Sequence, residues 1–242
     1  NSDSMILASI NSQTKTIYMT SFMRDLYANI PNVGIRKLNS AYAVGGGPLL
    51  VSTIESNYRV DIDNYASVDF SSMANIIDLV GGVDLEVSTQ EAGYINMYLD
   101  EQCRLQGLNA SDYYVAGGGI THLNGNQAVG FARIRYTSRG NEHSDYGRTS
   151  RQREILVQLM QKARSLDATT LLAVVNNMLP LITHNIDAAT LTTLIANAPS
   201  YINYDIQTDR IPYDGLYSNL GEELVPDFEA TINRLHQTIY GN

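Results

Sequence analysis

The first 22 residues show the apolar and polar pattern of a β-hairpin. Residues 4–10 and 16–22 are rich in apolar and β-branched side chains, and Asn11 to Thr14 between them are typical turn residues. A polar segment follows, in which Pro31 and Gly34 predict a loop. The chain therefore begins with two antiparallel strands whose outer ends meet.

The remaining pattern predicts strands that alternate with helices. Residues 65–70, 83–87 and 205–211 have the apolar or alternating pattern of strands. Residues 107–120 and 135–147 are polar or glycine-rich and predict loops. Helices are predicted over residues 36–57 (broken at Gly45 to Pro48), 71–79 (with Ser71 as N-cap), 91–105, 124–134, 148–164, 168–180, 187–197 and 226–240. This order predicts the α/β class, in a single layered domain over residues 1–242.

Composition narrows the class of protein. A chain of 242 residues with 44% hydrophobic and 17% charged residues can bury a core and fold. No apolar run reaches the roughly 18 residues of a membrane span. A single cysteine, Cys103, excludes an internal disulfide and a multi-cysteine metal site, and we expect it to be buried, with an exposed thiol as the alternative. The four histidines are dispersed, which argues against zinc and serine-hydrolase chemistry.

The charge is acidic overall but locally basic. The formal net charge of −9 argues against a nucleic-acid binder. Yet six arginines against two acids give the segment from Arg133 to Arg153 a net charge of +4. Arginine suits bidentate contacts with phosphate or carboxylate, so this basic island indicates an anion site. The alternative is a solvated helix face with ordinary ion pairs.

The spacing of these arginines suggests a ligand with more than one negative charge. Arg148, Arg151 and Gln152 share one face at the start of a predicted helix, where the helix dipole favours anions. Arginine is disfavoured in a first turn, so two of them there need a compensating anion. Arg133 and Arg135 alternate at the end of the preceding element. A diphosphate would satisfy such a group.

Two carboxylates lie at the outer ends of the predicted hairpin. Asp3 precedes the first strand and Asp25 follows the second, so we expect them to lie close together. A carboxylate near a diphosphate typically holds Mg²⁺ or a similar hard cation. The alternative for Asp25 is a turn-capping role.

Seven short motifs, in this order, resemble those of the LytR–CpsA–Psr family of bacterial cell-wall proteins. They are Asn1 to Met5, Ser21 to Asp25, Lys37 to Tyr42, Asp78 to Val83, Leu123 to Ala128, Ala132 to Arg135 and Asp145 to Gln152. The motifs cover residues 1–164, and the helical and strand segment 165–242 matches only in general character. The family's usual arginine before the Ser-Asp pair is Asn1 here.

The resemblance implies a fold, an activity and a location. The fold is an α-β-α domain with a mixed central sheet that holds a polyprenyl pyrophosphate. The activity is transfer of a phospho-glycan, such as wall teichoic acid or capsule, from the lipid carrier to peptidoglycan. The location is the outer face of the cell membrane, in a Gram-positive bacterium, with a membrane anchor upstream of Asn1.

The resemblance also implies roles for individual residues. Asp3 would be a ligand of Mg²⁺ or Mn²⁺, and Arg24 would contact the transferred phosphate. Asp25 would orient Arg24 or act as a base. The pyrophosphate would be bound by Lys37, Arg133, Arg135, Arg148, Arg151 and Gln152. Two other functions stay open, a polyprenyl-pyrophosphate hydrolase and a non-catalytic module that binds glycolipid.

Overall fold

The computed structural model describes residues 2–139 and 144–241. The chain forms two compact units, of which unit 1 consists of Asn1–Ser67 and His184–Asn242, and unit 2 of Val68–Thr183. The prediction of a single domain over residues 1–242 concerns how the two units combine, and it stays a prediction. Within the described ranges, no helix is both long and apolar enough to span a membrane.

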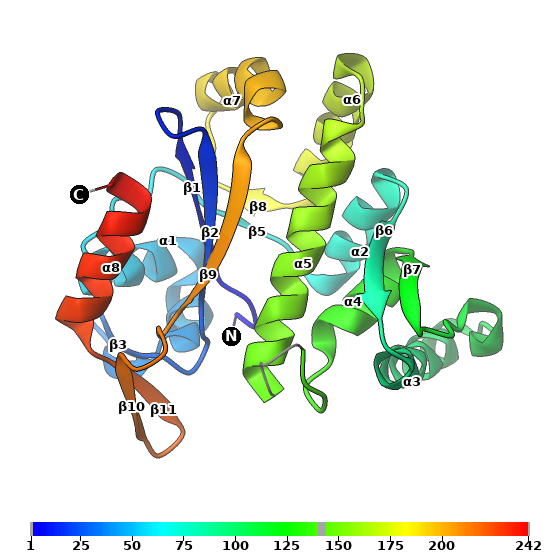
Figure 1. The fold of residues 1–242 in the computed structure, drawn as a ribbon, viewed down its shortest axis with the longest axis horizontal. Coiled ribbons are helices and arrows are strands. Elements are labelled where there is room, and N and C mark those ends of the chain that lie inside the picture. Colours follow the sequence, from blue (N-terminus) through cyan, green and yellow to red (C-terminus); the bar gives the residue numbers. More distant parts are fainter. Residues whose placement is uncertain (1, 140–143, 242) are drawn as a thin grey trace. The chain divides into compact units, whose positions relative to one another are not determined.

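Unit 1 is built on a mixed three-stranded sheet in the order β1-β2-β9 (Figure 1). β1 (Ile6–Asn11) pairs antiparallel with β2 (Thr16–Phe22), and β2 pairs in parallel with β9 (Asp205–Ile211). All but one residue of β2 are buried, as expected of a central strand. The predicted hairpin, the late strand and the mixed character of the sheet are confirmed.

The hairpin turn follows from its sequence. The side-chain oxygen of Asn11 accepts hydrogen bonds from the backbone N–H groups of Gln13 and Thr14, each at 3.0 Å. This side-chain turn reverses the chain directly after β1. It also sets the register in which Ile6 faces Ser21, so the start of β1 lies beside the end of β2.

Two small hairpins of unit 1 are absent from the sequence prediction. The loop predicted around Pro31 and Gly34 is the turn of a hairpin between β3 (Tyr27–Ile30) and β4 (Gly34–Lys37). A second hairpin joins β10 (Tyr217–Leu220) and β11 (Glu223–Pro226). Strands of four residues are too short for the alternation of side chains to stand out from the turn residues beside them.

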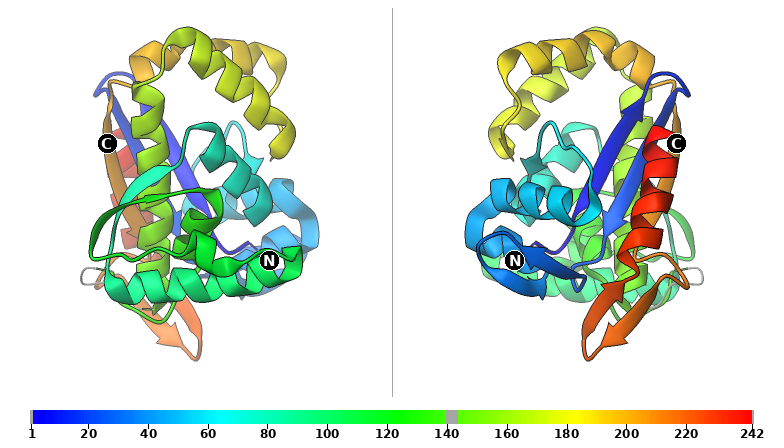
Figure 2. Two further views of the ribbon diagram at one scale, coloured as in Figure 1. Left: turned by 90° about the vertical axis from the view of Figure 1, so that its right-hand side faces the viewer. Right: turned by 90° about the vertical axis from the view of Figure 1, so that its left-hand side faces the viewer.

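The helices of unit 1 largely follow the prediction. They are α1 (Asn39–Tyr58), α7 (Ala188–Tyr201) and α8 (Phe228–Tyr240). The predicted break in α1 is confirmed, since Gly46 has φ 62° and ψ −154°, a conformation that only glycine adopts readily. Residues 36 and 37 belong to β4 rather than to the helix. α8 packs against α1 and β1. The right-hand view of Figure 2 shows α8, in red, beside β1, in blue.

Unit 2 combines a two-stranded antiparallel sheet with helices. β6 (Val83–Val87) pairs with β7 (Gly119–Leu123). Its helical elements are α2 (Phe70–Leu79), α3 (Thr89–Gln106), η1 (Ala110–Tyr113), α4 (Gly125–Arg133), α5 (Ser144–Arg164), α6 (Ala168–Met178) and η2 (Leu179–Leu181). Alternate residues of β6 are buried, as its pattern predicts. They join apolar residues of α2, α3, α4, β7 and α5 in one hydrophobic core.

Several boundaries predicted over residues 65–120 are corrected. Helix α2 is capped by Asp69, whose side chain accepts a hydrogen bond from the Ser72 N–H at 2.7 Å, and not by Ser71. The strand predicted over 65–70 is only β5 (Ala66–Ser67), because the cap turns the chain into the helix. The loop predicted over 107–120 contains η1 and the start of β7. The expected burial of Cys103 is confirmed.

The remaining short strand, β8 (Thr183–His184), lies where the chain passes from unit 2 back to unit 1.

Gly82 shows why a glycine stands between α2 and β6. Its φ is +81°, and a Cβ there would lie 2.7 Å from the carbonyl oxygen of Leu123. The predicted end of the helix at Gly81-Gly82 is therefore confirmed, and close packing against β7 gives its physical reason.

Candidate functional site

Charged side chains gather at one end of the unit 1 sheet. The backbone N–H of Phe22, the last residue of β2, donates to the carbonyl of Met5 at 2.8 Å, which extends the β1–β2 pairing to the residue before β1. As a result Asp3, before β1, meets Arg24, after β2, with 3.6 Å between Oδ1 and Nη1. The prediction that the two ends of the hairpin lie close together is confirmed. We call Asp3, Arg24, Asp25 and Lys37 the strand-end cluster.

Asp25 joins the two cations of this cluster. Its Oδ2 accepts a hydrogen bond from Arg24 Nε at 3.3 Å, and its Oδ1 lies 3.1 Å from Lys37 Nζ. The hydrogen bond from Lys37 to Asp25 raises the pKa of the lysine, and burial opposes this only in part. Both oxygens of Asp25 are thus engaged by cations. Of the two predicted roles for Asp25, the geometry favours orienting Arg24.

Lys37 is brought to the cluster by the hairpin that the sequence did not predict. It is the last residue of β4, and the next residue, Leu38, donates its backbone N–H to Leu26 O at 2.7 Å. Lys37 also lies 3.2 Å from Glu222, an acid that is 92% exposed. The side chains of Arg24, Asp25 and Lys37 keep between 20% and 29% of their surface exposed. They can therefore meet a ligand without unfolding.

The cluster fits a metal ion only in part. Among the described residues, no group of three or more histidine, cysteine, aspartate and glutamate side chains is placed to hold one. Asp3 is 43% exposed and offers a single carboxylate, while Asp25 is engaged by Arg24 and Lys37. Mg²⁺ is commonly held by one or two carboxylates together with substrate phosphates and water. Asp3 fits that kind of site and does not fit a closed protein site.

The arginines of the basic island lie in unit 2, in very different surroundings. Arg133, the last residue of α4, is exposed, and its guanidinium lies over the rings of Phe70 at 5.1 Å and Tyr98 at 4.8 Å. Arg135 follows with 40% of its side chain exposed, and its Nε lies 3.9 Å from Asp145 Oδ1. These two arginines offer charge at the surface of the unit.

The start of α5 corrects the sequence prediction. The helix begins at Ser144 rather than at residue 148, inside the segment predicted as a loop over residues 135–147. Residues 140–143 of that segment lie outside the described residues. Arg148 consequently stands in the second turn and is buried, with its Nη2 3.2 Å from Asp145 Oδ2. The argument that arginines in the first turn need a bound anion is therefore wrong, since Asp145 in the first turn supplies a carboxylate.

Gln152 lies next to the end of α4. Its Nε2 donates to the carbonyl of Ala132 at 3.4 Å, and its Oε1 is buried with no hydrogen-bond partner among the described residues. It follows Arg148 by four positions on α5, so the two share a helix face as predicted. Binding of a pyrophosphate by either residue stays a prediction.

Arg151 is fully buried, and the protein itself binds its guanidinium. Nε donates to Glu91 Oε1 at 2.9 Å, and the two terminal nitrogens donate to the carbonyls of Ile134, Thr137 and Ser138 at 3.1 to 3.3 Å. Its side chain has 0% exposed surface. The observed role of Arg151 is to support the backbone, and its predicted contact with a pyrophosphate stays a prediction.

Sequence reasoning missed Glu91, the partner of Arg151. Glu91 is 1% exposed and lies in the first turn of α3, where it completes a capping box with Ser88. The spacing Ser88-x-x-Glu91 is a signal for the helix start. No local signal connects Glu91 with an arginine 60 positions later.

The chain matches known proteins along its whole length. The LytR_cpsA_psr family model matches residues 1–235. The polyisoprenyl-teichoic acid–peptidoglycan teichoic acid transferase TagU of Oceanobacillus iheyensis is 33% identical over all of this chain and 70% of its own length. TagU of Enterococcus faecalis is 31% identical over 73% of this chain and 54% of its own length. The chain thus spans about half the length of the second of these relatives.

Other relatives bear a regulator's name, and solved structures share the fold. Regulatory protein MsrR of Staphylococcus aureus is 32% identical over 66% of this chain and 43% of its own length. The structure of TagT bound to LIIa-WTA has a TM-score of 0.75 and 21% identity, covering 99% of this chain and 84% of that one. Protein gbs0355 of Streptococcus agalactiae has a TM-score of 0.78 and 24% identity, covering 99% and 80%. The α/β fold of these structures is therefore also the fold of this chain.

Proposed function

The chain belongs to the LytR–CpsA–Psr family, and we propose that it transfers a phospho-glycan from a polyprenyl-pyrophosphate carrier to peptidoglycan. One observation carries the proposal, the 33% identity over the entire chain with a teichoic acid transferase. The glycan we propose is a wall teichoic acid or a similar anionic polymer.

The strand-end cluster has the chemistry that this reaction needs. Phosphoryl transfer depends mainly on positioning and on neutralising the charge of the phosphate oxygens. We assign contact with the transferred phosphate to Arg24, which keeps a quarter of its side chain exposed, and further neutralisation to Lys37. Asp25 orients both cations through its two oxygens.

The proposed reaction breaks one bond and forms one. A hydroxyl of the acceptor forms a bond to the phosphorus next to the glycan, while the bond from that phosphorus to the bridging oxygen breaks. The lipid monophosphate leaves, and the hydroxyl proton passes to a base. In unit 2 we assign binding of the pyrophosphate to four residues, Arg133, Arg135, Arg148 and Gln152. The buried Arg151 holds the backbone next to Arg135 through the carbonyl of Ile134.

Asp3 is the residue that would hold a metal. Mg²⁺ or Mn²⁺, when bound there together with phosphate oxygens, would supply positive charge to the transferred group. Asp3 already lies 3.6 Å from Arg24, so both would act on the same phosphate.

We place this activity at the outer face of the cell membrane of a Gram-positive bacterium, with an anchor upstream of Asn1. The relatives from Enterococcus, Oceanobacillus and Staphylococcus support this location.

A transfer assay tests the proposal. The protein is incubated with a short-chain polyprenyl-pyrophosphoryl disaccharide and a peptidoglycan oligomer, with Mg²⁺ or with a chelator, and the products are weighed by mass spectrometry. We expect the oligomer to gain the phospho-disaccharide, and less of it with the chelator. Release of lipid monophosphate without labelled oligomer would favour the hydrolase. Binding without any product would favour a glycolipid-binding module, a function in keeping with the regulator name of MsrR.

A further inference from the structure

The backbone that carries Arg135 has no regular secondary structure. Residues 134–139, which we call the arginine segment, follow α4 and, apart from an isolated bridge at Arg139, form neither a helix nor a strand. Backbone carbonyl groups outside regular elements need other hydrogen-bond donors when they are buried. What supplies those donors determines where the segment lies.

Arg151 supplies the donors from α5. One terminal nitrogen donates to Ile134 O at 3.3 Å, and the other donates to Thr137 O and Ser138 O at 3.1 Å each. These carbonyls lie on both sides of Arg135. The backbone under Arg135 is therefore held at both ends by one buried guanidinium.

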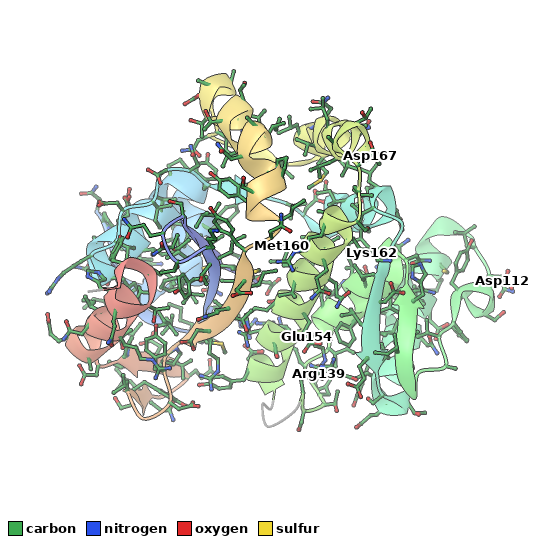
Figure 3. The ribbon with its side chains drawn as sticks, turned by 45° about the horizontal axis from the view of Figure 1, so that its top comes forward. Asp112, Arg139, Glu154, Met160, Lys162 and Asp167 are labelled. Atoms are coloured by element: carbon green, nitrogen blue, oxygen red, sulfur yellow. The ribbon has the colours of Figure 1, made fainter. Side chains whose placement is uncertain are left out.

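Arg139 fastens the other end of the segment in the opposite direction. Its Nε donates to Glu154 Oε1 at 2.9 Å, and its Nη2 donates to Glu154 Oε2. Figure 3 shows these two side chains pointing toward each other between the segment and α5. Nη1 of Arg139 also donates to Glu91 at 3.4 Å. Two arginines thus join the segment to α5. Arg139 of the segment binds Glu154 of α5, and Arg151 of α5 binds carbonyls of the segment.

Glu91 neutralises both arginines from α3. Its Oε1 accepts from Arg151, and its Oε2 accepts from Arg139 and from the backbone and hydroxyl of Ser88. Burial acts to raise the pKa of Glu91, but the hydrogen bonds from Ser88 and Arg151 and the charge of Arg139 outweigh it, so the pKa is lowered. Glu91 is therefore ionised at neutral pH, as the buried guanidinium of Arg151 and the partly buried one of Arg139 require.

We propose that Glu91 and Glu154 are positioning residues for pyrophosphate binding, because they fix the two arginines that place the segment bearing Arg135. This inference rests on the proposed function. Arg135 keeps 40% of its side chain exposed, and the backbone on both sides of it is held by Arg151 through the carbonyls of Ile134 and Thr137, so this backbone fixes the point from which its side chain starts. An error of about 1 Å in such a group can cost up to roughly a hundredfold in activity.

Positioning and electrostatics predict opposite signs for the loss of Glu154. Removing a carboxylate makes the surroundings more positive, so a long-range electrostatic role predicts tighter binding of an anion. A positioning role predicts weaker binding. Glu154 is suited to this test because it is 33% exposed and because Arg139 has a second carboxylate partner, Glu91.

Asp84 offers a matched control. It also carries one negative charge and also binds α5, through Lys162 at 2.7 Å, eight positions after Glu154 on the same helix (Figure 3). Asp84 contacts no residue of the arginine segment among the interactions described for it. Asp84→Ala therefore removes the same charge and an ion pair to the same helix, and leaves the segment in place.

Calorimetry with inorganic pyrophosphate, combined with the transfer assay, tests the proposal. We expect Glu154→Ala to bind pyrophosphate about tenfold more weakly than the unmodified protein and to lose kcat/KM for the lipid donor, with unchanged KM for the acceptor. Glu154→Asp, which keeps the charge, should recover part of the loss. Asp84→Ala should bind as tightly as the unmodified protein, and all three variants should keep their circular dichroism spectrum.

Each other outcome decides against the proposal. If Glu154→Ala binds pyrophosphate as tightly as the unmodified protein, or more tightly, the positioning role is overturned while the proposed function stands. An equal loss in Asp84→Ala would reduce the effect to general stability and would also overturn it. If the unmodified protein neither binds pyrophosphate nor transfers the glycan, the proposed function fails, and the inference fails with it.

Discussion

Arg24 in unit 1 and Arg151 in unit 2 are the same residue type in opposite environments. Arg24 keeps 25% of its side chain exposed and meets two carboxylates at 3.3 and 3.6 Å. Arg151 has no exposed surface and donates to one carboxylate and three backbone carbonyls. From the sequence, both are anion-contact candidates.

The comparison teaches that burial divides the work among arginines. A guanidinium removed from water must be saturated by protein acceptors, because an unpaired buried charge is very costly. Arg151, whose donors are saturated in this way, holds the backbone and has little left for a ligand. A partly exposed arginine can exchange water for a phosphate at small cost. Arg24 suits the ligand, and Arg151 suits the scaffold.

The largest expected effect is on stability, from Arg151→Ala. The substitution leaves Glu91 as a buried charge with one arginine fewer, and it leaves three carbonyls without their donor. Loss of one partner of a buried pair costs about 3–5 kcal/mol. We expect the free energy of unfolding in urea to fall by that amount.

The exposed Arg104 on α3 is the control for Arg151, and its alanine variant should unfold within about 0.5 kcal/mol of the unmodified protein. Equal stability of the Arg151 and Arg104 variants would contradict the scaffold role.

The reverse pattern is expected for Arg24→Ala. Because Arg24 is partly exposed, the variant should fold and melt nearly as the unmodified protein does. Loss of a group that stabilises charge in the transition state costs roughly 10²- to 10³-fold in rate. Transfer measured by mass spectrometry should fall by that factor.

Arg59→Ala is the matched control in unit 1, since Arg59 is 62% exposed and pairs only with the surface acid Glu229 among its described contacts. It should transfer at the normal rate. Full transfer by Arg24→Ala would show that Arg24 does not contact the reacting phosphate.

The stability of the chain should also depend on pH through Glu91, the carboxylate that pairs with Arg151. The pKa of Glu91 is lowered below its ordinary value of 4.5 in the folded chain. Ionised Glu91 therefore stabilises the fold above pH 4.5, and this stabilisation is lost as the pH falls through the lower folded pKa. Urea unfolding between pH 7 and pH 3 should show a smaller loss for Glu91→Gln than for the unmodified protein. A difference between the two that is constant with pH would contradict this linkage.

The smallest effects are expected around Lys37. Loss of one charged hydrogen bond to a phosphate costs about 1.5–3 kcal/mol, so Lys37→Ala should slow transfer by roughly 10- to 150-fold. Glu222→Ala removes the 92% exposed partner of the same lysine. Since surface ion pairs contribute about 0–1 kcal/mol, this variant should keep its stability and its rate. If Glu222→Ala transferred more slowly than Lys37→Ala, the role that we assign to Lys37 would be contradicted.

Much of the fold was predictable because local patterns are strong there. The hairpin of β1 and β2, the strand β9, the broken helix α1 and the alternating strand β6 follow from side-chain periodicity and turn residues. The four-residue strands were missed and the start of α5 was misplaced, because a stretch of only a few residues is too short to show a clear period.

The candidate site divides in the same way. The sequence by itself determined which residue types are available, and the strand ends brought Asp3 and Arg24 together as the hairpin predicts. Only the tertiary structure decided three ion pairs: Lys37 with Asp25, Arg148 with Asp145, and the buried Arg151 with Glu91. The reason is physical. Periodicity records which side of an element faces inward, whereas the partner of a buried charge is chosen by packing between elements that lie far apart in the chain.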